Sequence, residues 1–249
     1  MHLRHTGWIV SAAALLCSCG APKAKLTVAA AANLTNVFSE AGNAFKAKTG
    51  VEVTFSYGPT AELAQQIANG APFDLFAAAD IEHVDSLVST GKLTASSRSL
   101  YALGQLALWV PNGDQSGVRE LKDLTRPQIR FIAIAQPELA PYGNATIEVL
   151  KNSGLWDTVQ PKLVYANSIS QAKQWAASGN ADAAFTAYSL VLHERGTIMK
   201  AAPRLYHPIE QALAIVTSSP RIQEANQFRS FILGPEGRTI LAKSGYLLP

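Results

Sequence analysis

A strand–turn–helix unit occurs twice in succession between residues 26 and 80, and it restricts the fold more than any other feature of the chain. The apolar run 26–32 leads through Asn33 into a helical pattern, and the run 51–58 leads through Thr60 into another. Strands that alternate with helices predict a parallel α/β sheet. In such sheets ligands bind at the carboxyl ends of the strands, beside helix N-termini. Asn33 and Thr60 are therefore expected at one crevice, whose geometry suits a small anion.

The rest of the chain repeats the α/β alternation after an unusually long apolar run, 100–110. A parallel strand rarely needs this length, so we interpret the run as a strand that leaves one domain and enters a second. A later apolar run, 211–217, is interpreted as the return crossing. We therefore predict an α/β fold of two lobes with mixed, mainly parallel sheets, in which two crossing strands form the hinge of a clamp. The expected lobes are 22–104 plus 214–249, and 105–213.

The first 18 residues have the pattern of an export signal. Arg4 supplies the positive charge, and the apolar stretch 7–16 is too short to span a bilayer. The following Leu-Cys-Ser-Cys-Gly resembles a bacterial lipobox in which Cys19 is the lipid-bearing first residue of the mature protein. We expect an exported, periplasmic protein that is anchored to a membrane through lipid on Cys19. The alternative is ordinary cleavage close to Cys19, which would release a free protein.

Composition argues against several classes of function. The 249 residues carry a formal net charge of +3, which is too weak for the basic patch of a nucleic-acid-binding protein. Both cysteines lie in the N-terminal segment, so the mature domain is expected to have neither a disulfide nor a thiolate metal site. The histidines of that domain are scattered without the spacing of metal ligands. No convincing pair of nucleophile and base occurs, so we expect neither enzymatic activity nor a cofactor.

Three segments carry a resemblance to a known family: 29–36 (AAAANLTN), 63–79 (LAQQIANGAPFDLFAAA) and 234–237 (GPEG). At these residues the chain resembles the periplasmic molybdate-binding proteins of bacterial ABC importers, and the resemblance covers essentially the whole mature chain. It implies a periplasmic-binding-protein-like clamp that acts as a monomer. Such a protein captures molybdate or tungstate and delivers the anion to an ABC importer permease in the membrane.

Members of that family hold the oxyanion with neutral groups only. The positions that the resemblance implies as molybdate contacts are Asn33, Thr60, Tyr142 and Ile169. The contribution of Ile169 would be its backbone N–H. Many members have a tyrosine where this chain has Ala187, one residue before Tyr188, whereas others use the turn that corresponds to Tyr142. We favour Tyr142 and keep Tyr188, with the backbone N–H groups of Ala32 and Ala61, as further candidates.

Neutral groups suffice for a tetrahedral dianion because its oxygens only accept hydrogen bonds. Helix N-termini supply unpaired N–H groups and a partial positive charge, and no acidic side chain is expected in the pocket. A purely structural interpretation remains for Asn33 and Thr60 as helix caps and for Tyr142 as a packing residue. Other functions left open are a receptor for another oxyanion or a small organic anion, an enzyme on an α/β scaffold, and the sensing half of a transcription regulator.

Overall fold

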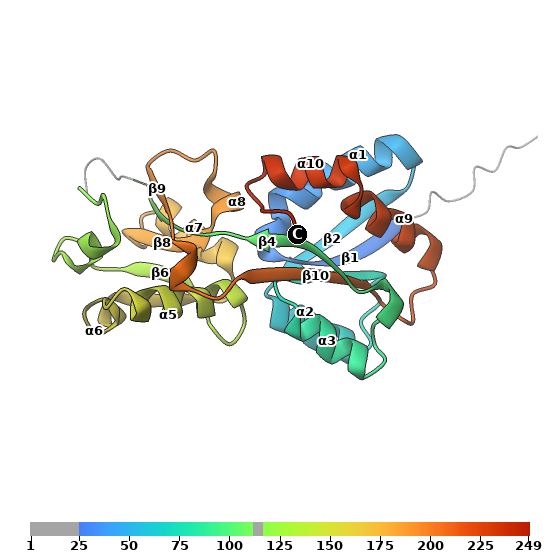
Figure 1. The fold of residues 1–249 in the computed structure, drawn as a ribbon, viewed down its shortest axis with the longest axis horizontal. Coiled ribbons are helices and arrows are strands. Elements are labelled where there is room, and N and C mark those ends of the chain that lie inside the picture. Colours follow the sequence, from blue (N-terminus) through green and yellow to red (C-terminus); the bar gives the residue numbers. More distant parts are fainter. Residues whose placement is uncertain (1–24, 112–116) are drawn as a thin grey trace, which may run out of the picture.

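The computed structural model describes residues 25–111 and 117–249, which form two α/β lobes side by side (Figure 1). Each lobe is built on one five-stranded sheet. The predicted export signal, 1–18, and Cys19 lie outside the described residues. Among the described helices, none combines the length and the apolar character needed to cross a bilayer.

The sheet of the first lobe has the strand order β2-β1-β3-β10-β4. Its strands are β1 (Lys25–Ala31), β2 (Glu52–Gly58), β3 (Leu75–Ala77), β4 (Ser99–Gly104) and β10 (Ile209–Ile215). Its helices are η1 (Ala32–Leu34), α1 (Thr35–Thr49), α2 (Thr60–Ala68), α3 (Glu82–Ser89), η2 (Ala95–Ser97), α9 (Ile222–Leu233) and α10 (Pro235–Lys243). Helices α2 and α3 cover one face of the sheet, and α1, α9 and α10 cover the other (Figure 1).

The sheet of the second lobe has the order β7-β6-β8-β5-β9. Its strands are β5 (Leu106–Val110), β6 (Ile132–Ala135), β7 (Leu163–Ala166), β8 (Ala183–Ala187) and β9 (Thr197–Lys200). Its α-helices are α5 (Pro141–Asn152), α6 (Trp156–Val159), α7 (Ile169–Ala177) and α8 (Tyr188–Val191). Short 3₁₀ helices are η3 (Leu121–Thr125), η4 (Gln160–Lys162) and η5 (Pro203–Leu205). Helices α5 and α7 pack on opposite faces of this sheet (Figure 1).

Each sheet is mixed in equal parts, with two parallel and two antiparallel pairings. The sequence predicted mainly parallel sheets, and the crossing segments explain the difference. Strands β1, β2, β6 and β7 point their carboxyl ends at the other lobe, whereas β10 and β5 enter their sheets from that side. The entering strands therefore run against β3 and β8, their respective neighbours.

The chain crosses between the lobes twice, as predicted. The run 100–110 divides at Gln105 into β4 of the first sheet and β5 of the second. The return crossing differs from the prediction. All of β10 belongs to the first sheet, so the chain crosses back over 201–208 rather than at residue 213. The apolar run 211–217 is a buried sheet strand, and hydrophobicity alone does not distinguish such a strand from a hinge strand.

Candidate functional site

A small cavity lies between the lobes, where the carboxyl ends of strands from both sheets meet helix starts. Its volume is about 10 Å³, which is room for about one water molecule. Its lining residues are Ala31, Ala32, Asn33, Gly58, Pro59, Thr60, Ala79, Ala140, Pro141, Tyr142 and Ile169. Both lobes contribute to this lining, and all of these residues are uncharged.

The structure brings together the four principal positions expected from the sequence. Asn33, Thr60, Tyr142 and Ile169 line this one cavity, with side chains that are 1–2% exposed, and Ala32 lines it with them. The other two candidates lie elsewhere. The Ala61 N–H donates across the lobes to the Leu139 carbonyl at 3.2 Å. Tyr188 is half-buried at the start of α8, where its N–H donates to Gln105 in the first crossing and its ring faces Lys200.

Four helical segments begin at the cavity, two from each lobe. Helix η1 starts directly after β1 and runs into α1, and α2 starts two residues after β2. In the second lobe, Pro141 opens α5, where its missing N–H costs nothing, and the Ser168 hydroxyl caps α7 by accepting from Gln171 N–H. The first N–H groups of a helix have no partner inside it and carry a partial positive charge. The cavity therefore attracts an anion without any cationic side chain.

The hydroxyls of Thr60 and Tyr142 both have a proton to donate. The Ala79 N–H donates to Thr60 Oγ1 at 3.2 Å, and Gln211 Nε2 donates to the Tyr142 hydroxyl at 3.0 Å. A hydroxyl has one proton and two acceptor lone pairs. Neither hydroxyl donates to another atom of the described residues, so both protons remain available to a ligand. Burial raises the pKa of Tyr142 well above its ordinary value, which keeps the phenol protonated.

Asn33 is held by a buried polar network. Its Nδ2 donates to Gln211 Oε1 at 3.0 Å and to the Tyr246 hydroxyl at 2.9 Å. The Tyr246 hydroxyl in turn lies 2.9 Å from the Asn33 carbonyl, and the Ser189 hydroxyl reaches both groups from the second lobe. Asn33 Oδ1 is the one buried side-chain polar atom of the described residues that has no hydrogen-bond partner. These contacts fix the start of η1 relative to the C-terminal segment and α8.

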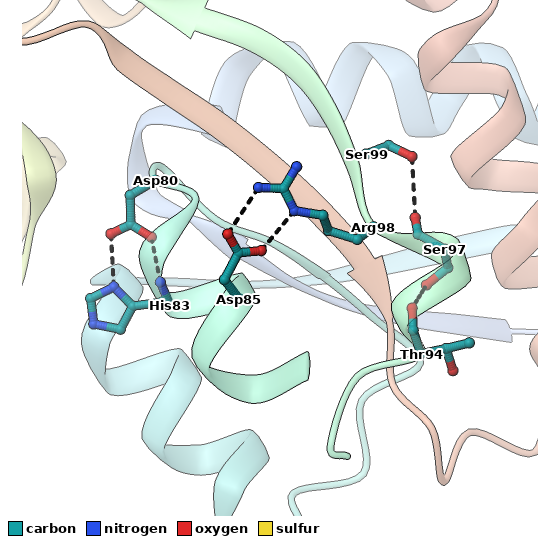
Figure 2. A network of polar contacts seen from close by, with 7 residues as sticks. All are labelled: Asp80, His83, Asp85, Thr94, Ser97, Arg98 and Ser99. Atoms are coloured by element: carbon teal, nitrogen blue, oxygen red, sulfur yellow. Dashed lines mark hydrogen bonds and ion pairs between the residues drawn. The ribbon is translucent and has the colours of Figure 1, made fainter. Parts of the chain in front are cut away.

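The carboxylate closest in sequence to the cavity is directed toward α3. Asp80 follows Ala79, and its oxygens accept from the His83 N–H at 3.1 Å and meet His83 Nδ1 at 2.7 Å (Figure 2). The hydrogen bond to Asp80 raises the pKa of His83, although burial opposes this. Figure 2 also shows the carboxylate of Asp85 paired with the guanidinium of Arg98. Arg98 Nε and Nη2 donate to the two Asp85 oxygens at 2.7 and 3.0 Å, which ties α3 to the segment before β4. The Asp80 charge is thus engaged by His83.

A larger groove of about 650 Å³ adjoins the cavity and shares Ala79, Ala140 and Pro141 with it. The acidic residues along this groove are Asp80, Glu82, Glu138, Glu148 and Glu210. Its basic residues are His83, Lys151 and His207. An excess of carboxylates disfavours an anion, so the small neutral cavity is the better candidate site despite its size. Within the described residues, no cluster of His, Cys, Asp and Glu has the arrangement of a metal site.

Sequence reasoning missed the side chains that support the cavity from behind, Tyr101, Gln211 and Tyr246. Gln211 is a polar residue within an apolar run, which was the only local signal for it. Tyr246 lies 213 residues from the asparagine that it contacts, and nothing near it in the sequence indicates a site.

Two lobes with a mixed sheet each, two chain crossings and a neutral cavity lined with hydrogen-bond donors define a two-lobe solute-binding protein. The family model of the bacterial extracellular solute-binding protein matches residues 26–247, and the chain belongs to that family. This confirms the predicted class, an extracytoplasmic binding protein rather than an enzyme.

The relatives of the chain include several molybdate-binding proteins. It is 37% identical to molybdate-binding protein ModA of Rhodobacter capsulatus over 224 residues, which are 90% of this chain and 88% of the relative. It is 35% identical to ModA of Azotobacter vinelandii over 246 residues, 96% of each. The solved periplasmic molybdate-binding protein of Azotobacter vinelandii superposes with a TM-score of 0.86 at 34% identity, covering 90% of this chain and 99% of that structure. The predicted fold and the predicted family resemblance are both confirmed.

Proposed function

We propose that this protein captures molybdate or tungstate outside the cytoplasm and delivers it to an ABC importer permease. The observation that carries the proposal is the convergence of helix starts from both lobes, with the hydroxyl protons of Thr60 and Tyr142, on one neutral cavity. The molybdate-binding relatives support the same ligand. In this proposal Thr60 and Tyr142 contact the anion through their hydroxyls, and Ala32, Asn33 and Ile169 contact it through backbone N–H groups at their helix starts.

Neutral donors are sufficient to bind a dianion tightly. A hydrogen bond to a charged acceptor contributes about 1.5–3 kcal/mol. Roughly six or seven such bonds offset the desolvation of the anion and leave about −8 to −12 kcal/mol, which corresponds to micromolar to nanomolar Kd. Sulfate has the same charge and shape but is smaller. It would leave some donors unpaired in a cavity built for molybdate, and unpaired buried donors are costly.

Calorimetric titration with molybdate, tungstate, sulfate and phosphate tests the proposal. We expect molybdate and tungstate to bind with Kd of about 1 μM or tighter, and sulfate at least about 100-fold more weakly. Equal and weak heats for all of the anions would contradict the proposal. Preferential binding of phosphate or of a small organic acid would instead favour a receptor for that ligand.

Lipid attachment at Cys19, which lies outside the described residues, is the second part of the proposal. The lipobox-like run 16–20 supports it. Attachment of acyl chains would hold the monomeric receptor near its permease, because acyl chains bury in the bilayer. This step is tested by expressing the protein in a bacterial host and measuring its partition between a detergent phase and an aqueous phase. The unsubstituted protein should enter the detergent phase and Cys19→Ser should remain in the aqueous phase; the same partition for both would contradict lipidation.

A further inference from the structure

The side chain of Gln211 lies at the centre of the buried polar network behind the cavity. It is fully buried on β10, at a register shift between Gln211 and Ala212 in the pairing with β4. Such a bulge redirects a side chain out of the regular alternation of the strand. Gln211 is absent from the lining of the cavity, so a ligand there would not touch it directly.

One amide group connects ligand-cavity residues of both lobes. Gln211 Oε1 lies 3.0 Å from Asn33 Nδ2, in the first lobe, and 2.9 Å from the Tyr101 hydroxyl. Gln211 Nε2 donates at 3.0 Å to the hydroxyl of Tyr142, in the second lobe. Sequence separations of 178 and 69 residues to Asn33 and Tyr142 show that only the folded clamp assembles this connection.

We propose that Gln211 is a positioning residue that directs the Tyr142 hydroxyl proton toward the anion and couples Tyr142 to Asn33; the inference rests on the proposed function. Because Nε2 occupies a lone pair of the phenol oxygen, the single proton of Tyr142 is left for the ligand. A group at position 211 that could only accept would take that proton away from the ligand.

The neighbours of Gln211 link the direction of its amide to the direction of the Asn33 amide. Asn33 Nδ2 donates to Oε1, and the Tyr101 hydroxyl proton is shared between Oε1 and the Ala78 carbonyl, each at 2.9 Å. Turning the Gln211 amide alone would bring its NH₂ against the NH₂ of Asn33, donor against donor. The two amides can therefore turn only together, which makes the donor directions of Asn33 and Tyr142 interdependent.

Rotating both amides by half a turn would also give the unpartnered Asn33 Oδ1 hydrogen-bond partners. If the amide oxygen and nitrogen exchanged places in both side chains, Asn33 Oδ1 would accept hydrogen bonds from Gln211 and Tyr246. The Asn33 NH₂ would then lie where Oδ1 now has no partner. Gln211 Oε1 would then accept the Tyr142 proton. The network thus has two consistent arrangements, one offering the anion the Tyr142 proton and the other offering it an Asn33 N–H, and Gln211 links them.

A double-mutant cycle on molybdate affinity tests the inference. Gln211→Met keeps the approximate volume but removes both hydrogen-bonding ends, and Tyr142→Phe removes the hydroxyl on which Gln211 acts. We expect Gln211→Met to weaken binding about 10- to 100-fold in the otherwise unsubstituted protein, and less than about threefold in the Tyr142→Phe background. Tyr57→Phe is the matched control, since it removes a hydroxyl that contacts Ser39 at 3.2 Å, outside the network of Gln211. It should change molybdate affinity less than about threefold.

If Gln211→Met lowered molybdate affinity equally with and without Tyr142→Phe, or did not lower it, the inference would be overturned and the proposed function would stand. If the unsubstituted protein bound no oxyanion, both would be overturned. Should Gln211→Met fail to fold, Gln211→Glu replaces it in the same cycle. Its carboxylate only accepts, and its charge repels the anion equally in both backgrounds, so that repulsion cancels. A loss at least about tenfold larger with Tyr142 present than in the Tyr142→Phe background is expected, and equal losses would again overturn the inference.

Discussion

Replacing Thr60 with valine separates a ligand-binding role from a structural one. Thr60 is 2% exposed, so valine fills nearly the same space and removes only the hydroxyl. The lost donor to a dianion contributes about 1.5–3 kcal/mol, which corresponds to about 10- to 150-fold in Kd. The Ala79 N–H, which donates to Thr60 at 3.2 Å, also loses its partner. That loss costs about 1–3 kcal/mol of unfolding free energy, but it occurs in the free and bound protein alike.

The two effects are measured by different assays. Calorimetry with molybdate reports the lost donor, and thermal unfolding without ligand reports the unpaired N–H. Thr60→Val should lower the melting temperature by about 2–12 °C, given about 2–4 °C per kcal/mol for a chain of this length. Thr60→Ser retains the hydroxyl and should bind within about threefold of the unsubstituted protein.

A ligand-binding role of Thr60 is excluded if Thr60→Val melts at a lower temperature but binds molybdate as tightly as the unsubstituted protein. Thr60 would then serve only to hold the loop at Ala79 against the start of α2. Weak binding by Thr60→Ser, equal to that of the valine variant, would also count against a role for the hydroxyl.

Three further predictions concern the surroundings of the cavity. Molybdate affinity should vary less than about twofold between about pH 6 and about pH 9. The reason is that Tyr142 is the only ionisable residue in the described lining, and burial raises its pKa. A tenfold change in affinity across this pH range would contradict the prediction. Asp80 raises the pKa of His83 by hydrogen bonding, so the pairing stabilises the fold below about pH 6.5 and this contribution is lost as pH rises through the folded pKa. His83→Gln should flatten the pH dependence of the melting temperature between about pH 5 and about pH 8, and an unchanged slope would contradict the pairing. A Cβ on Gly104 would lie 2.6 Å from Gln211 Nε2 and inside contact distance of the Tyr142 hydroxyl. Gly104→Ala should therefore lower the melting temperature and the molybdate affinity together, and an unchanged affinity would show that the pair is not displaced.

Local patterns were enough to predict much of this fold. The helical period after Asn33 and Thr60 placed two helix starts beside consecutive strands, and the structure has η1 and α2 beginning at Ala32 and Thr60. The long run 100–110 predicted the first crossing, because no single strand needs that length. These inferences succeeded because each depends on neighbouring residues only.

Features that depend on distant residues could not be predicted in this way. The return crossing was misplaced because β10 is buried in the sheet, and a buried strand has the same composition whether or not it forms a hinge. The network of Asn33, Gln211 and Tyr246 joins residues as far as 213 positions apart, and tertiary packing alone decides that they meet. Site residues at helix starts could be proposed, whereas the residues that orient them from behind could not.

A crystal structure with bound molybdate tests most directly the claim that uncharged donors from both lobes hold the anion. We expect oxygens of the anion about 2.7–3.1 Å from the Thr60 and Tyr142 hydroxyls and from helix-start N–H groups such as that of Ile169. Molybdate held by an arginine or lysine side chain, or located in the acidic groove outside this cavity, would contradict it.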